Sequence, residues 1–232
     1  LERLGCDSVK IASADIDHFP LIRQAARTGM CIQMDTGNAT LGEIEQAVEI
    51  CLAEGNSRLI IHNCPSGYPA RIESINLRLI PTLGRMFPEA AVAYSDHTPG
   101  WDMDVAALAM GADLLEKTIT TDRTQKSPEH MFSLEPGQMK EFVRVVRQVE
   151  KAMGTPRRIL GEEEKQMRLK IRRSVFLKTD AARGERLATD HVEFRRPGTG
   201  ISPARFEELE GLCFARDLKK GTLLSPGDLT RP

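Results

Sequence analysis

Residues that could bind an anion or a metal ion recur through the first part of the chain, each near the end of a short apolar run. They are Lys10 and Ser13, Asp35 and Thr36, His62 and Ser66, Ser95-Asp96-His97, and Lys117 and Thr118. A lysine inside an apolar strand needs a partner for its charge, which favours a functional role for Lys10. An aspartate beside a histidine is a reasonable setting for a metal ligand, which makes His97 a candidate.

The apolar runs predict the elements that must position these side chains. We expect strands at residues 8–13, 31–36, 58–63, 90–95 and 113–119, with helical patterns between them. Thr40 with Glu43 three residues later forms a capping box, which predicts a helix running to about Leu52. Short strands that alternate with helices indicate βα units and a parallel sheet.

The predicted fold class is α/β, an incomplete TIM (β/α)8 barrel of about strands 4–8. In such a barrel every strand directs its carboxyl end at one mouth, where the active site lies. At about 30 residues per unit, roughly three of the eight units would precede this chain. An open five-stranded sheet is the structural alternative.

The last third of the chain has a different sequence pattern. A long helix is expected from about Pro136 to Met153, followed by a charged segment, GEEEKQMRLKIRR, expected as a solvated helix or connector. From Ser174 onward, short strand-like runs and Gly turns predict a small β-rich domain. Residues 180–190 and 217–228 read as a duplicated phrase, for which we expect a strand, a tight Gly turn and a short helical turn.

Composition excludes several classes of protein. Lys plus Arg is 32 and Asp plus Glu is 33, so the net charge gives no reason to expect a nucleic-acid partner. No run of about 18 apolar residues exists, and no secretory segment is visible, so we expect no membrane span. Five cysteines without a CxxC pair indicate reduced thiols and a cytoplasmic protein.

An ordered set of phrases resembles the N-acetylneuraminate (sialic acid) synthase family. The phrases are KIAS, DTG with TLGEIEQAV, HNCPSGYPA, YSDHTPG, LEKTITTDR with SPEH and SLEP, and FRRPGTG. The resemblance implies a synthase barrel portion over residues 1–155, a linker over 156–173 and a SAF (antifreeze-like) domain over 174–232. It also implies a domain-swapped homodimer, in which the SAF domain reaches the barrel of the partner.

Members of this family condense phosphoenolpyruvate with an N-acetylated amino sugar, such as N-acetylmannosamine, in cell-surface polysaccharide biosynthesis. By resemblance, phosphoenolpyruvate would be held by Lys10, Ser13, Ser66 and Ser95. The sugar would be held by Tyr68, Glu129 and Arg196. His97 would bind a divalent metal, Mn²⁺ or Mg²⁺, that polarises the aldehyde. His97 and Glu129 are the expected catalytic residues.

Two positions depart from the family pattern. Thr118 stands where the family has a second metal histidine, and threonine replaces imidazole poorly. His62, Glu116 or His130 could then assist the metal, or the metal role has changed. Asp35 replaces a serine and needs a cationic partner, either Lys10 or Lys117.

These departures leave alternatives open. The chain could be a non-catalytic relative that binds a sugar phosphate, or a related barrel aldolase with Lys117 as its Schiff-base lysine. We also expect this stretch to be inactive without the strands that would precede it.

Overall fold

The computed structural model describes residues 1–232, which form two compact units, Leu1–Gly154 and Thr155–Pro232. Each unit has its own hydrophobic core. None of the helices combines the length and the apolar character needed to cross a membrane.

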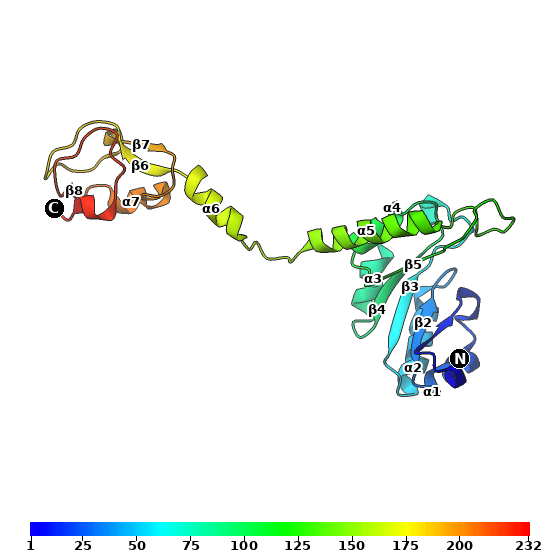
Figure 1. The fold of residues 1–232 in the computed structure, drawn as a ribbon. Coiled ribbons are helices and arrows are strands. Elements are labelled where there is room, and N and C mark those ends of the chain that lie inside the picture. Colours follow the sequence, from blue (N-terminus) through cyan, green and yellow to red (C-terminus); the bar gives the residue numbers. More distant parts are fainter. The chain divides into compact units, whose positions relative to one another are not determined.

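Five parallel strands form the sheet of the first unit, in the order β1-β2-β3-β4-β5 (Figure 1). Their bounds are β1 Ser8–Ile11, β2 Cys31–Asp35, β3 Leu59–Asn63, β4 Ala91–Asp96 and β5 Leu114–Lys117. Every strand pairs with its neighbour in sequence, as consecutive βα units require. The predicted α/β class and parallel sheet are therefore confirmed, with strand ends moved by one or two residues.

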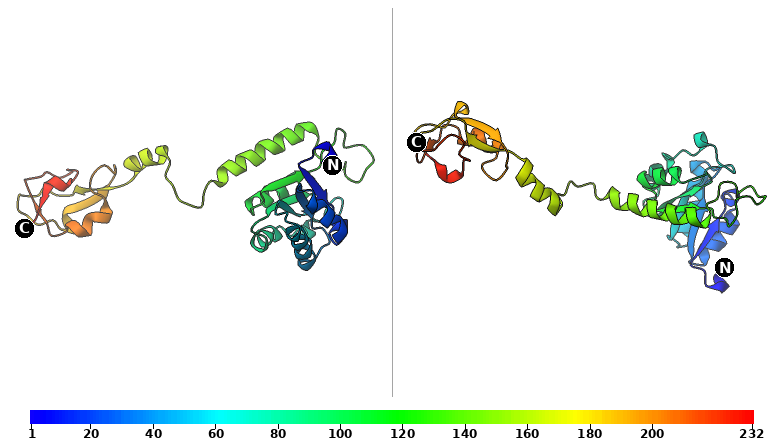
Figure 2. Two further views of the ribbon diagram at one scale, coloured as in Figure 1. Left: turned by 90° about the horizontal axis from the view of Figure 1, so that it is seen from below. Right: turned by 45° about the horizontal axis from the view of Figure 1, so that its top comes forward.

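Helices follow the strands and lie against one side of this sheet (Figure 2). They are α1 Phe19–Arg27, α2 Leu41–Ala53, α3 Leu79–Met86, α4 Asp102–Ala109 and α5 Pro136–Met153. The predicted capping box is present at α2, where the Thr40 side chain accepts from the Glu43 amide and Glu43 accepts from Thr40 in return. The long helix α5 also has its predicted bounds.

Strand parity decides which side chains meet the helices. Alternate residues of a strand point to opposite faces. Ile11, Met34 and Ile61 belong to the buried core shared with the helices. Lys10, Asp35 and His62 have the opposite parity, so the opposite face of the sheet carries polar groups.

The second unit contains two small antiparallel sheets. Helix α6 (Glu162–Ile171) lies within the charged segment and buries none of its residues. Strand β6 (Ser174–Leu177) pairs with β7 (Val192–Arg195), and β8 (Cys213–Phe214) pairs with β9 (Leu229–Thr230). The short helix α7 spans Phe206–Leu209.

The duplicated phrase forms two matching turns that contact each other. The amide of Arg183 donates to Asp217, and the amide of Lys220 donates to Asp180, each at 2.8 Å. Gly184 and Gly221 both adopt positive φ, as the predicted tight turns require. The expected strand within each phrase is wrong, because Ala181 and Leu218 make one isolated bridge and the strands β7 and β9 follow the short helical turns.

Candidate active site

The polar face of the sheet brings together side chains that are far apart in sequence. Lys10 lies opposite Gln33, Asp35 opposite His62, and Ser95 opposite Glu116 in the strand register. Because parallel strands end at the same edge of a sheet, these residues form one cluster near the carboxyl ends of the strands.

Lys10 is the cationic centre of this cluster. Its Nζ lies 2.9 Å from Asp35 Oδ2 and 2.5 Å from Glu116 Oε1. Burial alone would lower the pKa of Lys10, but hydrogen bonds to Glu116 and Asp35 outweigh burial and raise it. Lys10 therefore stays charged, with its ammonium paired to both carboxylates. Of the two cations expected for Asp35, the structure selects Lys10.

Glu116 connects Lys10 to Ser95. Its Oε1 accepts from Ser95 Oγ at 3.0 Å as well as from Lys10. Burial opposes ionisation of Glu116, but the bond from Lys10 prevails and its pKa falls below the ordinary value. Two of the residues predicted to bind phosphoenolpyruvate thus share one carboxylate.

His62 is fully buried beside both carboxylates. Its Nδ1 lies 3.8 Å from Asp35 Oδ1 and 3.6 Å from Glu116 Oε2, while its Nε2 lies 3.1 Å from Gln33 Oε1. Burial lowers the pKa of His62, and the charges of Asp35 and Glu116 oppose that change without reversing it. The imidazole is therefore neutral at pH 7.

Loops after the strands hold the predicted serines. Ser13 Oγ accepts from the Gly37 amide at 3.0 Å, and Ser66 Oγ donates to Asn38 at 2.8 Å. A Cβ on Gly37 would lie 2.8 Å from Ser13 Oγ, so this close approach requires glycine. The loop after β2 therefore links the loops after β1 and β3.

Aromatic rings form a second cluster. Tyr68 stacks on His97 with ring centroids 4.5 Å apart, and Phe132 lies 6.0 Å from His97. Burial raises the pKa of Tyr68, and the charge of Glu129 adds to the shift. Tyr68, His97 and Glu129, three of the predicted residues, are thus brought into one neighbourhood.

The donors around His97 do not fit a metal ion held by this chain alone. His97 Nδ1 and Thr118 Oγ1 are both buried without a hydrogen-bond partner. The neighbouring Asp96 is occupied, because it accepts from Tyr94 and Thr98 and pairs with Lys117. His97 therefore contributes one imidazole, with threonine as a poor companion ligand.

Two other candidates have structural partners. His130 Nδ1 lies 2.7 Å from Thr120 Oγ1. Lys117 is almost fully buried between Asp96 and Asp104. Its amine contacts both carboxyl groups, which does not favour the Schiff-base alternative.

Arg196 belongs to the second unit. It lies directly after β7, and its Nε donates to the Ile171 carbonyl at 3.1 Å. The side chain is exposed within that unit, so its guanidinium can contact another surface.

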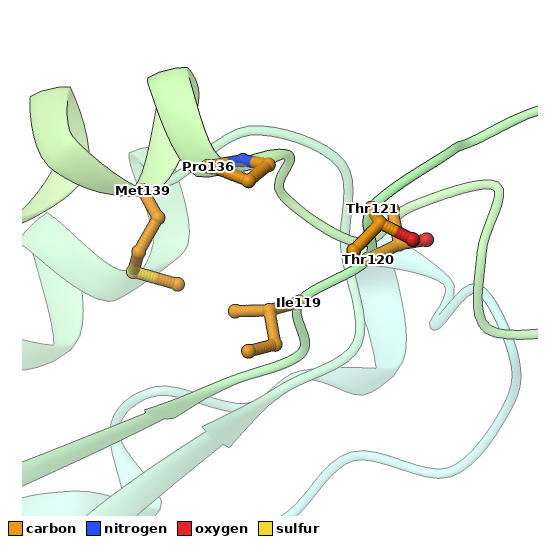
Figure 3. A pocket seen from close by; sticks show the side chains of 5 residues that line it. All are labelled: Ile119, Thr120, Thr121, Pro136 and Met139. Atoms are coloured by element: carbon orange, nitrogen blue, oxygen red, sulfur yellow. The ribbon is translucent and has the colours of Figure 1, made fainter.

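A separate hollow of about 370 Å³ lies between the segment after β5 and the first turns of α5 (Figure 3). It is lined by Ile119, Thr120, Thr121, Pro136 and Met139. The lining carries no charged side chain, so this hollow is unsuited to a doubly anionic substrate.

Sequence reasoning missed part of the polar cluster. No motif in the sequence marks Gln33, although its side chain points to the same face of β2 as that of Asp35 and contacts His62. Cys64, counted in the sequence only among the reduced thiols, is buried, and the hydroxyls of Ser95 and Ser13 contact its thiol. Strand parity was the signal that could have found Gln33.

Comparison with known proteins then decides the family. The NeuB family profile matches residues 1–158, and the SAF domain profile matches residues 172–230. The chain belongs to the NeuB family.

Curated relatives of this NeuB-family chain are longer than the chain itself. An uncharacterized protein, MJ1065, of Methanocaldococcus jannaschii is 37% identical over 201 residues, which cover 87% of this chain and 59% of that protein. The N,N'-diacetyllegionaminic acid synthase of Campylobacter jejuni is 34% identical over 226 residues, covering 97% of this chain and 67% of the enzyme. The second of these relatives is a synthase of a sugar acid, as its name states.

The fold is also found in solved structures. A spore coat polysaccharide biosynthesis protein E from Chromobacterium violaceum superposes with a TM-score of 0.79 over 99% of this chain and 69% of that chain. Its identity is 23%, so this likeness concerns the fold alone.

Proposed function

We propose that this chain is the substrate-binding portion of a synthase that condenses phosphoenolpyruvate with an N-acetylated amino sugar to give a nonulosonic acid and phosphate. The observation that carries the proposal is the shared contact of Lys10 and Ser95 with Glu116 on the polar sheet face. Membership of the NeuB family, whose relatives include a diacetyllegionaminic acid synthase, supports the same reaction class.

Lys10 supplies the positive charge for the anionic substrate. A phosphate or carboxylate oxygen forms a strong charge-assisted bond with an ammonium. Hydroxyls on Ser13, Ser66 and Ser95 add neutral donors around it, from loops and strands that the sheet holds in place. No side-chain nucleophile is needed, because the work is positioning and charge neutralisation.

The sugar would lie beside the aromatic cluster. Tyr68 exposes about half of its surface while stacking on His97, so its phenol can meet a ligand. Glu129 is exposed nearby in the loop before α5 and offers carboxylate oxygens to sugar hydroxyls. Arg196 would bind the N-acetyl group from the second unit of a partner subunit, in a domain-swapped homodimer.

The reaction balances without an oxidant or reductant. C3 of phosphoenolpyruvate bonds to the aldehyde carbon of the open sugar, and the aldehyde oxygen takes up a proton. Water adds to C2 of the enolpyruvyl unit, and inorganic phosphate leaves. The polar sheet face holds the anion while the aromatic cluster orients the aldehyde.

The five strands would be the later strands of a (β/α)8 barrel. The outer edges of β1 and β5 have no strand partner in this chain. Leu114 and Ile119, in and just after β5, expose 38% and 69% of their surfaces, which further strands would cover.

Calorimetric titration with phosphoenolpyruvate tests the proposal. Wild-type chain should bind, and Lys10→Met should weaken binding by about 10- to 100-fold, the range for loss of one charge-assisted bond. Arg147→Ala, on the exposed face of α5, is the matched control and should bind as wild type does. Equal affinity of Lys10→Met and wild type would remove the proposed anion site.

A second function is favoured by the incomplete donor set at His97 and Thr118. In that case the chain binds a sugar phosphate without condensing it. Mass spectrometry of the complete protein with phosphoenolpyruvate and a panel of N-acetylhexosamines separates the two functions. Appearance of a 3-deoxy-nonulosonate establishes the synthase, and binding without product establishes the non-catalytic relative.

A further inference from the structure

Three metal-ligating side chains, none of them His97 or Thr118, meet on the polar face of the sheet. One ligand atom each from Asp35, His62 and Glu116 lies within 4.8 Å of the other two. The residues come from β2, β3 and β5, so only the folded sheet assembles them. One imidazole and two carboxylates make a donor set suited to a divalent transition-metal ion.

His62 directs an unused ring nitrogen into this group. The side chain is fully buried, and Nδ1 has no hydrogen-bond partner. Its Nε2 bonds to Gln33 Oε1, and Gln33 Nε2 in turn donates to Ser8 Oγ at 3.0 Å. This chain of bonds places the imidazole proton on Nε2 and leaves the lone pair of Nδ1 facing the carboxylates. Gln33 is therefore a positioning residue of the kind found behind metal-bound histidines.

Asp35 supplies a second unused donor. Its Oδ1 is buried without a hydrogen-bond partner and lies 3.8 Å from His62 Nδ1, while Glu116 Oε2 lies 3.6 Å from the same nitrogen. These separations are too long for hydrogen bonds. They are close to the spacing of about 3.0–3.5 Å between two ligands of one ion at metal–ligand lengths of about 2.1 Å. Two facing lone-pair donors are stabilised by a cation between them.

Lys10 supplies a cation to only some of these donor atoms. Its ammonium contacts both carboxylates, but it leaves His62 Nδ1 and Asp35 Oδ1 without hydrogen bonds. A divalent ion would satisfy all three side chains and would compete with the ammonium for the carboxylates. Lys10, once displaced, would be free to turn toward an anion.

We propose that Asp35, His62 and Glu116 form a binding site for a divalent transition-metal ion that exchanges with the ammonium of Lys10. The proposal rests on these residues and does not require synthase activity. It also assigns the ion to ligands other than His97, the ligand that the sequence resemblance implies.

Titration of the chelator-treated, dialysed chain with Mn²⁺, with free Mn²⁺ followed by electron paramagnetic resonance, tests the site. Wild type should bind one ion. His62→Gln should weaken binding by about 10-fold or more, and Gln33→Leu should weaken it less, as loss of a residue behind a ligand does. Lys10→Met should tighten binding, because it removes the competing charge. His130→Gln is the matched control and should match wild type.

Several results would overturn the site. It fails if neither wild type nor Lys10→Met binds Mn²⁺. It also fails if His97→Gln removes binding while His62→Gln does not. Because His62 is buried, folding of each variant is checked by the fluorescence of Trp101, the single tryptophan. If His62→Gln fails to fold, the other two variants still test the site. Mn²⁺ affinity should rise in Lys10→Met and fall in Gln33→Leu.

Lys10→Met separates this site from the proposed function. The variant should bind phosphoenolpyruvate more weakly and Mn²⁺ more tightly. Unchanged phosphoenolpyruvate affinity with tighter Mn²⁺ binding would refute the anion site and support the metal site. Weaker phosphoenolpyruvate binding with unchanged or weaker Mn²⁺ binding would support the anion site and refute the metal site.

Discussion

Asp104 Oδ2 lies 3.3 Å from Lys117 Nζ, and both side chains are almost completely buried between β5 and α4. Lys117 also pairs with Asp96, so one ammonium faces two carboxyl groups. Burial, together with the charge of Asp96, raises the pKa of Asp104 to about 8, although Lys117 opposes the shift. Asp104 is therefore mostly protonated at neutral pH, beside a lysine whose amine is held in place.

This arrangement predicts a loss of stability as pH rises from about 4 to about 8. A carboxyl whose pKa is raised in the folded state holds its proton more tightly there than in the unfolded state. Its contribution is complete below the unfolded pKa of about 4 and is lost as pH rises through about 8. The free energy of unfolding should fall by up to about 1 kcal/mol per pH unit in that window.

Asp104→Asn should remove most of this dependence, because asparagine cannot ionise. The measurement is urea unfolding between about pH 5 and pH 8, followed by Trp101 fluorescence, which reports on the first unit only. Asp102→Asn, at the start of the same helix, serves as the control. If the free energy of unfolding falls with pH equally in Asp104→Asn and in wild type, the proton responsible for the pH dependence is not bound by Asp104.

Gly37→Ala should disturb anion binding without touching a charged group. The added Cβ would lie 2.8 Å from Ser13 Oγ and 3.1 Å from the Cys64 carbonyl, so Ser13 must move. We expect phosphoenolpyruvate affinity to fall by about 3- to 10-fold, the loss of one neutral hydrogen bond. Gly42→Ala is the control, because a Cβ at this position on α2 meets open space. Its phosphoenolpyruvate affinity should equal that of the wild type.

Thr40→Ala should destabilise α2 by about 1 kcal/mol, the usual effect of removing an N-cap hydroxyl. The Thr40 hydroxyl accepts from the Glu43 amide, and alanine leaves that amide without its partner. Urea unfolding followed by Trp101 fluorescence measures the change. Thr40→Ser keeps the hydroxyl and should lie close to wild type; a loss as large as that of alanine would contradict the capping role.

The paired turns of the second unit predict a crossed pattern of amide hydrogen exchange. Asp217→Ala should accelerate exchange at Arg183, and Asp180→Ala should accelerate exchange at Lys220, because each aspartate accepts from the amide in the other turn. NMR exchange measurements at these two amides provide the check. Faster exchange only within the substituted turn would mean that the turns are independent.

Much of the fold could be predicted from local pattern. Apolar runs located all five strands of the sheet, and Thr40 with Glu43 located the start of α2. The strand expected inside each duplicated phrase was wrong because Ala181 and Leu218 pair only with each other, and such pairing depends on contacts distant in sequence.

The candidate site was harder to predict for the same reason. Lys10, Ser95 and His97 could be selected by type and position. The meeting of Lys10 with Glu116, 106 residues away, depends on strand register. Asp35 had two equally charged candidates in sequence, Lys10 and Lys117, and only the fold separates them, by placing the two lysines on opposite faces of the sheet.

Strand parity has a consequence for mutation by insertion or deletion. Removing a single residue within β2 would turn Asp35 toward the helices and Met34 toward the polar face of the sheet. A charged side chain would then be buried in the hydrophobic core, and an apolar side chain would lie among the polar residues. Exchange of one side chain for another alters one contact, whereas a slip of one position inverts a whole strand. Natural variants of this sheet should therefore carry substitutions within the strands but no insertions or deletions there.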